Sequence, residues 1–425
     1  MRTRAVLAAA FAAVATIPLA PTATAATSPS LEGVPAVQHV VVLVLENESF
    51  ATTWSAASPA KYLNGLVAQG AFVPNYYGTG HVSLDNYIAM TSGLAGAQIA
   101  PTYSDCLGIN LYTCSQDVSA AATVSGGSIA DQIESAGLSW RQYADGTTQP
   151  CVHADYSQTA SPDPFQGNGA TPTNTGAGPD YADRHVPFLY YSNIIDDPSR
   201  CRARLRPFTD LSGDLAADRL PSYSFITPDT CNDGHDAPCS GNKGPGGLSS
   251  ADAFLQRTLP TLLAYLRAHD GVMFITFDEG GSSDTSGCCT GGPGGVSGFG
   301  GQVGMLVLGA PVANGSTQTK YDHASLLRTT EDMLGISTHL GNAASATPIT
   351  GIWSAAHPLD AASSGGSSPA SPSPTPSGGA VAPAAIGLPD TSGPGSAGVL
   401  GAAALALLLG VPAARGLRRR RTGPA

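Results

Sequence analysis

Positive charge is scarce in this 425-residue sequence, which has 20 Lys and Arg against 31 Asp and Glu. The part of the chain between the two ends has 13 Lys and Arg against 30 Asp and Glu, a net charge of −17. This count leaves out Arg2, Arg4, Asp390, Arg415 and the four arginines of residues 418–421. A body this acidic argues against a nucleic-acid partner and against adhesion to anionic lipid by charge alone. A local basic pocket that receives an anion is still compatible with it.

The sequence also lacks an internal repeat, and no second CxxC-type pair or HxxxH motif accompanies its eight cysteines. An even set is typical of disulfides in an oxidising compartment, with a zinc site as the alternative. Eight cysteines allow on the order of a hundred connectivities. Proximity along the chain favours Cys106–Cys114 and Cys231–Cys239, which leaves Cys151–Cys201 and Cys288–Cys289.

The first 26 residues have the features of a secretory signal peptide. Arg2 and Arg4 precede an apolar stretch over residues 5–20, and small residues follow around Thr24. We expect cleavage near residue 25 or 26, followed by one large domain over residues 30–360.

The carboxyl-terminal end combines four features in order. A Ser/Pro/Gly-rich linker at 361–387 precedes a short segment at 388–393, an apolar run at 395–414 and a basic tail at 415–425. About 20 apolar residues are enough for a transmembrane helix, and the arginines are expected to stay on the cytoplasmic side. The sequence therefore predicts an exported protein that is held at the outer face of the cell surface or released from it.

Residues 388–393 resemble the LPxTG sorting signals of Gram-positive surface proteins, in which a sortase cuts after threonine and joins the protein to the cell wall. Ser392 stands where those signals have glycine, with Gly393 one place later. Covalent attachment to the wall and simple anchoring through a transmembrane helix are both open.

Long apolar runs indicate the centre of the fold. Residues 38–45 are almost all β-branched or leucine, as expected of a central parallel strand buried on both faces. Similar runs follow at 272–277 and 303–308, with a short strand at 222–227. Helical patterns lie between the strands, and this alternation predicts an α/β sandwich. The helical patterns are at residues 60–69, 128–135, 251–268 and 324–334.

Two glycine-rich stretches, 241–249 and 280–301, are too long to be ordinary connections in a compact domain. We expect them to be loops that cover a site. Surface excursions without that role are the alternative.

Acidic and amide side chains follow three of the expected strands. Glu46 and Asn47 follow the first, Asp278 and Glu279 follow a later one, and the acidic segment 229–236 follows the short one. Functional groups gather at the carboxyl ends of strands in open α/β sheets. Carboxylates that converge there repel one another unless a cation lies among them. The pattern predicts a divalent metal site. Any one of these carboxylates alone would most often be a helix cap or a solvated loop residue.

Ser83 lies between a glycine-containing loop at 78–80 and a helical pattern. A serine at the amino end of a helix is most often an N-cap. Free N–H groups there also attract phosphate oxygens, and a metal on the serine oxygen would stabilise the attacking alkoxide. No C/S-x-P-x-R signature surrounds Ser83, which disfavours a sulfatase.

From His39 to about residue 336, the chain resembles the metal-dependent phosphoesterase family of bacterial acid phosphatases and phospholipases C, part of the alkaline phosphatase superfamily. That implies an α/β, alkaline-phosphatase-like three-layer sandwich with a central, mostly parallel sheet. The markers are Glu46-Asn47-Glu48-Ser49-Phe50, similar to ENxSF; His81-Val82-Ser83-Leu84-Asp85-Asn86-Tyr87, similar to HxSxxNY; Arg184-His185-Val186-Pro187-Phe188; residues 227–236, similar to TPNxCNDxHD; and Phe277-Asp278-Glu279-Gly280.

The resemblance also implies a set of metal ligands with Ser83 as the nucleophile. Related acid phosphatases have two aspartates where this chain has an aspartate and a glutamate, so the identity of the divalent cation is open. The implied ligands are Glu46, Asn47, Ser83, Asp278 and Glu279.

Asn86, His185 and His235 would, on the same resemblance, contact the phosphoryl oxygens. Asp233 lies two residues from His235 and is expected to orient it. The leaving oxygen needs a proton, which His235 or His323 would supply at mildly acidic pH. A purely structural role is the alternative for His323.

Three functions are compatible with these residues. The first is an acid phosphatase that hydrolyses phosphomonoesters, phosphoinositide head groups among them, through a phosphoserine intermediate. The second is a phospholipase C for phospholipid diesters, although such relatives are typically longer and this sequence becomes linker after Ile352. The third is a catalytically silent surface protein that uses the fold for binding.

Overall fold

The computed structural model describes residues 31–354, except for 97, 100–101, 103–104, 107–110, 154–176, 179, 290–293 and 296–298. The expected signal peptide and everything expected from residue 361 onward lie outside the described residues. Within the described part, no helix combines the length and the apolarity needed to cross a bilayer.

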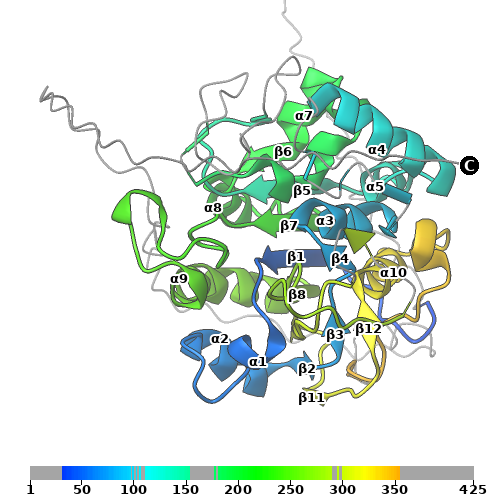
Figure 1. Ribbon diagram of the computed structural model, residues 1–425. Helices are drawn as coiled ribbons and strands as arrows, with labels where there is room; N and C mark the ends of the chain where they lie inside the picture. The colour runs from blue at the N-terminus through cyan, green and yellow to red at the C-terminus, as the bar shows by residue number, and fades with distance from the viewer. Residues whose placement is uncertain are drawn as a thin grey trace, which may run out of the picture. The chain divides into compact units, whose positions relative to one another are not determined.

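An eight-stranded sheet forms the centre of the fold, in the order β11-β2-β10-β8-β1-β7-β5-β6 (Figure 1). Only β10 runs antiparallel to its neighbours in this described sheet, so the sheet is mixed and mostly parallel, as predicted. Its strands are β1 (His39–Leu45), β2 (Ala71–Val73), β5 (Trp140–Ala144), β6 (Leu205–Pro207), β7 (Tyr223–Thr227), β8 (Gly271–Phe277), β10 (Met305–Gly309) and β11 (Gly315–Ser316).

β1 lies in the middle of the sheet, with β7 and β8 as parallel partners. Val42 is in register with Phe225 of β7 and Phe274 of β8. Every residue of β1 after His39 is buried, and each such aliphatic side chain contributes about 1.5–3 kcal/mol of transfer free energy. The predicted central parallel strand is confirmed.

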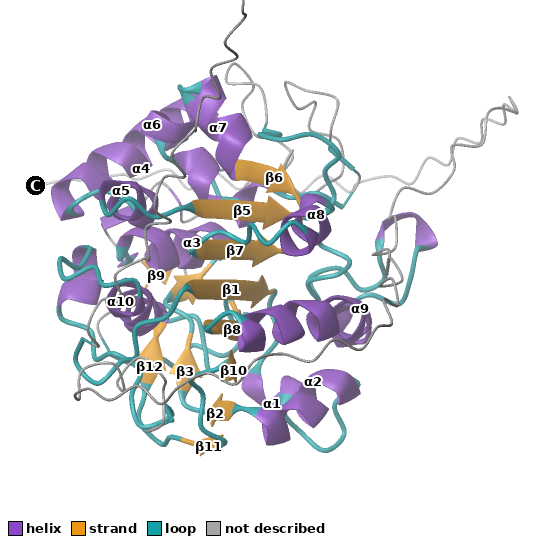
Figure 2. Cartoon of the chain, turned by 180° about the vertical axis from the view of Figure 1, so that it is seen from behind, coloured by secondary structure: helices purple, strands orange, loops and turns teal. Residues whose placement is uncertain are grey.

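Helices cover both faces of the sheet and produce three layers (Figure 2). In both views α8 and α9 lie on one side, and α3, α5 and α10 lie on the other. The helices expected at 60–69, 128–135, 251–268 and 324–334 correspond to α2, α5, α9 and α10. The helices are α1 (Phe50–Thr53), α2 (Lys61–Leu66), α3 (Ser83–Ser92), α4 (Leu111–Ser125), α5 (Ile129–Ser135), α6 (Ser192–Ile195), α7 (Pro198–Arg204), α8 (Asp210–Ala216), α9 (Gly247–Ala268) and α10 (His323–Met333).

Short elements complete the described chain. β3 pairs with β12, and β4 pairs with β9, each in a separate two-stranded sheet. These strands are β3 (Tyr76–Tyr77), β4 (Gly80–His81), β9 (Gly294–Gly295) and β12 (Tyr321–Asp322). The 3-10 turns are η1 (Val67–Gln69), η3 (Asp183–His185), η4 (Pro187–Tyr190), η5 (Ser240–Asn242) and η6 (Gly341–Ala344).

The first glycine-rich stretch is only partly a loop. α9 begins at Gly247, so the prediction of a loop through residue 249 is wrong. The Gly246 N–H donates to the Ser250 hydroxyl at 3.0 Å, and this contact steadies the start of the helix.

The second glycine-rich stretch packs along the segment that leads to Ser83. The Gly300 N–H donates to the Gly78 carbonyl, and β4 pairs with β9. A Cβ at Gly300 would lie 2.5 Å from the Gly80 carbonyl oxygen, so only glycine permits this close approach. The described part of this stretch therefore lies against residues 78–81, which lead to Ser83.

All eight cysteines form disulfides, in the pairing that sequence proximity favoured. The alternative of a cysteine zinc site is wrong, because no cysteine in the described chain is free. The pairs are Cys106–Cys114, Cys151–Cys201, Cys231–Cys239 and Cys288–Cys289.

Candidate active site

Three neighbouring parallel strands end at one edge of the sheet, and the residues that follow them contact one another. The Glu46 N–H, after β1, donates to the carbonyl of Asp233 in the loop after β7, at 2.9 Å. The Asp278 N–H, after β8, donates to the carbonyl of Leu45 at 2.9 Å. The strand ends thus bring the acidic segments together as predicted.

Asn47 joins the ends of β1 and β8. Its φ of 51° lies in the left-handed region, which asparagine adopts more readily than most residues. In this conformation its N–H donates to Asp278 Oδ1 at 3.1 Å, and its side-chain Nδ2 donates to Glu279 Oε1 at 2.8 Å. Asn47 therefore holds both carboxylates that follow β8.

Ser83 is the first residue of α3 and is only 4% exposed. Its hydroxyl donates to Glu46 Oε2 at 2.9 Å, so it is turned toward the strand ends and makes no capping bond. The next amide in the helix, the Leu84 N–H, donates to Asp105 Oδ1 at 2.9 Å. A carboxylate thus lies at the helix N-terminus, and no sequence motif had indicated Asp105.

The second oxygen of Glu46 faces Tyr87 and His185. The Tyr87 hydroxyl donates to Glu46 Oε1, and His185 Nε2 lies 3.3 Å from the same oxygen. The Tyr87 and His185 rings are stacked, with centroids 5.4 Å apart. Burial raises the pKa of Glu46 well above its ordinary value, and the charges of Asp278 and Asp233 add to this shift. Tyr87 belongs to the HxSxxNY-like motif, and that position was the available signal for its role.

His185 also approaches Asp233, the third member of a buried cluster. His185 Nδ1 lies 3.2 Å from Asp233 Oδ2. One ligand atom from each of Glu46, His185 and Asp233 lies within 4.8 Å of the other two. Burial lowers the pKa of His185 well below its ordinary value and raises that of Asp233. Neutral imidazole and carboxylate oxygens are common metal ligands.

The residues expected to hold a cation fit that role. Asn47 Oδ1 and Asp278 Oδ2 are buried and have no hydrogen-bond partner. Buried polar atoms are nearly always paired, so such atoms beside Glu46 and Ser83 suit a cation. Burial raises the pKa of Asp278 to about 6, against the opposing effect of N–H groups from Asn47 and Glu279.

Glu279, the fifth expected ligand, is already engaged. Oε1 accepts from Asn47, and Oε2 lies 3.1 Å from His81 Nδ1. Burial raises the pKa of Glu279 to about 8, and the hydrogen bond from His81 opposes this shift. His81 Nε2 contacts the carbonyl of Asp284, which ties the second glycine-rich stretch to the site.

Asn86 uses its whole amide group within the protein. Oδ1 accepts from the N–H groups of Thr79 and Gly80, and Nδ2 donates to the carbonyls of Gly80 and Val82. Asn86 thus shapes the loop before Ser83, and its expected contact with a phosphoryl oxygen would need one of these bonds to open.

His323 is buried with both ring nitrogens engaged. Nε2 lies 2.6 Å from the Asp278 carbonyl, which can only accept, so Nε2 carries the proton and Nδ1 accepts from the Tyr76 hydroxyl at 2.9 Å. Burial lowers the pKa of His323 to about 4. This geometry matches the structural alternative for His323, because the ring holds the backbone of Asp278.

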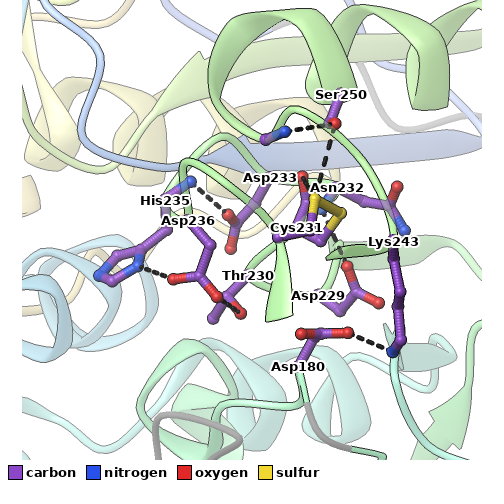
Figure 3. Close-up of a disulfide and its surroundings, with 12 residues drawn as sticks. Asp180, Asp229, Thr230, Cys231, Asn232, Asp233, His235, Asp236, Lys243 and Ser250 are labelled. Atoms are coloured by element: carbon purple, nitrogen blue, oxygen red, sulfur yellow. Dashed lines mark hydrogen bonds and ion pairs between the residues drawn. A yellow bond between two sulfur atoms is a disulfide. The ribbon is translucent and has the colours of Figure 1, made fainter. Parts of the chain in front are cut away.

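His235 is partly exposed, and Figure 3 shows its surroundings. Its Nδ1 contacts Asp236 Oδ1 at 2.8 Å, whereas Asp233 Oδ1 accepts from the His235 backbone N–H. The side chain that orients the ring is therefore Asp236 rather than the expected Asp233. His235 Nε2 lies 3.1 Å from Arg184 Nη2, and it must accept there because a guanidinium only donates.

Sequence similarity to known proteins points to one family. The profile of the phosphoesterase family matches residues 55–337. A phosphatidylinositol-3-phosphatase of Mycobacterium tuberculosis is 26% identical over 322 residues, which cover 75% of this chain and 84% of that protein. A probable acid phosphatase of Kluyveromyces lactis is 27% identical over 332 residues, which cover 75% of this chain and 65% of that protein.

One solved structure with some similarity is that of a protein in the alkaline phosphatase superfamily from Vibrio parahaemolyticus. The TM-score is 0.42 at 14% sequence identity, and the match covers 73% of this chain and 69% of that chain. The family match rests on the sequence profile, which spans more than half of the chain and includes Ser83, His185 and Asp278. This chain belongs to the phosphoesterase family.

Proposed function

We propose that this chain is an exported, metal-dependent acid phosphatase that hydrolyses phosphomonoesters through Ser83. As a member of the phosphoesterase family it is a phosphoric ester hydrolase. The observation that carries the finer proposal is the 2.9 Å contact between Ser83 Oγ and Glu46 Oε2, beside the unpaired oxygens of Asn47 and Asp278.

Ser83 is the nucleophile in this proposal. Its Oγ attacks phosphorus as the bond from phosphorus to the alcohol oxygen breaks, and water then cleaves the phosphoserine and restores the hydroxyl. A divalent cation held by Glu46, Asn47, Ser83 and Asp278 would stabilise the serine alkoxide and the charge on the phosphoryl oxygens. Before substrate arrives, Glu46 holds the Ser83 hydroxyl and the Asn47 N–H holds the Asp278 carboxylate.

His235 is the better candidate for proton transfer. Its side chain is 25% exposed, whereas His323 is buried and bonded at both nitrogens. A phosphate that draws Arg184 away from His235 would free Nε2. Once free, Nε2 takes a proton from solvent, gives it to the leaving oxygen and recovers one from the attacking water. The proton of the Ser83 hydroxyl passes to Glu46 Oε2, which already accepts its hydrogen bond, and returns to Oγ when the phosphoserine is cleaved, so the two half-reactions balance.

The relatives named above support the proposed substrate class. One is named a phosphatidylinositol-3-phosphatase and another a probable acid phosphatase, so we include phosphoinositide head groups among the proposed substrates. Export and surface anchoring stay part of the proposal. The four disulfides support export, because such bonds persist in oxidising compartments. Release by a wall hydrolase would distinguish a wall-attached protein from one held by a transmembrane helix.

The test is turnover of p-nitrophenyl phosphate and bis(p-nitrophenyl) phosphate by the full chain, with and without EDTA. We expect hydrolysis of the monoester, loss with EDTA and recovery with added metal. A panel of phosphoinositides, nucleotides, phosphosugars and phosphatidylcholine then identifies the alcohol side of the ester. Preference for phosphatidylcholine would indicate a phospholipase C, and inactivity on every ester would leave a binding protein.

A further inference from the structure

We propose that Asp105 is a built-in competitor of the substrate, whose carboxylate occupies the place beside Ser83 that a phosphoryl group would take. An incoming phosphate must displace this carboxylate, so Asp105 sets how tightly the site binds its substrate. This role deepens the proposed function and rests on it for the nature of that substrate, a phosphomonoester.

The first anion-binding group beside Ser83 is the amino end of α3. Leu84, the second residue of the helix, donates its N–H to Asp105 Oδ1 at 2.9 Å. Val82, at the N-cap position, makes no side-chain cap, and the Ser83 hydroxyl turns to Glu46 instead. A carboxylate from a distant segment therefore takes the N–H that follows the nucleophile. Free N–H groups at such a position bind phosphate oxygens.

The second anion-binding group is the guanidinium of Arg184, which is buried at 1% exposure. Its Nε lies 3.7 Å from Asp105 Oδ2, and its Nη2 lies 3.1 Å from His235 Nε2. Arginine binds carboxylate and phosphate oxygens alike, because both groups present their oxygens on one central atom. The two oxygens of Asp105 thus face the helix end and the guanidinium, as two phosphoryl oxygens would.

Asp105 is also placed so that it can leave. Its side chain is 13% exposed, whereas that of Glu46 is 0% exposed. Its backbone is held, since its N–H donates to the Thr102 carbonyl at 2.9 Å and the next residue forms the Cys106–Cys114 disulfide. Rotation of the side chain alone therefore moves the carboxylate from the helix end toward solvent, and the surrounding fold stays as it is.

The charge of Asp105 reaches into the rest of the site. Burial raises the pKa of Asp85 well above its ordinary value, and the charges of Glu279 and Asp105 add to this shift. A negative charge in this position opposes a phosphate dianion in the same way. A carboxylate that served only to support Arg184 for catalysis would work against the substrate, whereas a competitor acts in this direction.

A helix cap and a support for Arg184 are the two other roles that this geometry allows, and loss of the charge separates all three. A cap needs only an acceptor, which asparagine keeps, so phosphate binding would not change. A support needs the charge to hold the guanidinium, so phosphate would bind more weakly. A competitor needs the charge to keep its place, so phosphate would bind more tightly.

Calorimetry of the metal-loaded full chain with inorganic phosphate measures this difference without turnover. In Asp105→Asn the Kd should fall by about fivefold to tenfold, the usual difference between a charged and a neutral hydrogen bond. Asp252→Asn is the matched control, because Asp252 of α9 caps α2 through the N–H groups of Tyr62 and Leu63. Its Kd should equal that of the native chain.

Turnover of p-nitrophenyl phosphate separates binding from chemistry. In Asp105→Asn the KM should fall by the same factor as the Kd, with kcat unchanged, because the carboxylate is displaced from the bound substrate and from the transition state alike. Circular dichroism and melting show whether the variant is folded. A crystal structure of the native chain with phosphate should place an anion oxygen on the Leu84 N–H, with the Asp105 carboxylate turned away.

An unchanged or raised Kd in folded Asp105→Asn would overturn the competitor role, and so would a phosphate complex in which Asp105 still holds the Leu84 N–H. Tighter phosphate binding by Asp105→Asn in a protein that hydrolyses no ester would overturn the proposed function and leave the competition intact. Hydrolysis of phosphomonoesters with an unchanged Kd would do the reverse.

Discussion

The hydroxyl of Ser83 and Glu46 Oε2 are 2.9 Å apart, although 37 residues separate them along the chain. The strand end after β1 thereby meets the first turn of α3. This contact holds the Ser83 hydroxyl on a carboxylate that also lies 3.3 Å from His185 Nε2, and the proposed function depends on it.

Replacement of Ser83 by alanine should abolish phosphatase turnover. Loss of the nucleophile should lower kcat by about three orders of magnitude or more, while the stripped protein melts within a few degrees of the native chain. Ser92→Ala is the matched control, since Ser92 is a buried serine at the other end of α3 whose hydroxyl donates to the Ile88 carbonyl and accepts from the Leu94 N–H. Turnover of Ser83→Ala equal to the native rate would remove Ser83 from the mechanism.

Asn86→Ala should cost both stability and activity. The change leaves the buried N–H groups of Thr79 and Gly80 without their acceptor, at about 1–3 kcal/mol for each unpaired group. Urea unfolding measures the loss, and kcat reports the displaced loop before Ser83. The exposed Asn314→Ala is the control. An unchanged free energy of unfolding for Asn86→Ala would show that the loop holds its shape without this side chain.

His323 should make the protein less stable as the pH falls. Its pKa is lowered from 6.5 to about 4 in the folded chain, so between these values the unfolded chain binds a proton that the folded chain does not. Stability is therefore lost as pH falls through this window. His323→Gln keeps a donor for the Asp278 carbonyl but cannot titrate, so its stability should depend less on pH between 7 and 4, as chemical unfolding in EDTA would show. Parallel pH profiles would contradict the assignment.

Glu331 should have the opposite effect at higher pH. Burial raises its pKa from 4.5 to about 9, so the folded chain keeps a proton that the unfolded chain has lost, and stability decreases as pH rises between these values. Glu331→Gln retains an acceptor for the Leu340 N–H and should gain stability at pH 8 relative to pH 5. The exposed Asp117→Asn is the control. An equal change at both pH values would show that Glu331 does not titrate in this way.

The disulfides should differ in their contribution to stability. Cys151–Cys201 links residues 50 apart, and in the chain-entropy model its removal costs about 4 kcal/mol. Cys288–Cys289 joins neighbours and closes almost no loop, so its removal should cost less than about 1 kcal/mol. Guanidinium unfolding of the two double alanine variants compares them directly. Equal losses would mean that native contacts, and not loop closure, set the contributions.

The sequence predicted the elements whose environment is uniform along their length. β1 and β8 are apolar runs because both faces are covered, and the periodic patterns gave α5, α9 and α10. β5 (Trp140–Ala144) was not predicted, since Arg141 and Gln142 interrupt its apolar pattern. Arg141 pairs with Asp214, and Gln142 Nε2 donates to the His185 carbonyl, so each of the two side chains has a partner far away in the sequence.

The carboxyl ends of parallel strands coincide, and for this reason the sequence alone determined that Glu46, Asn47, Asp278 and Asp233 would share one edge of the sheet. Which side chains touch there was decided only by tertiary structure. His185 comes from η3 rather than a strand end, Asp236 rather than Asp233 faces the His235 ring, and His323 turns to the Asp278 backbone. Local sequence sets the direction of a strand, but the contacts of a side chain depend on packing between segments far apart in the chain.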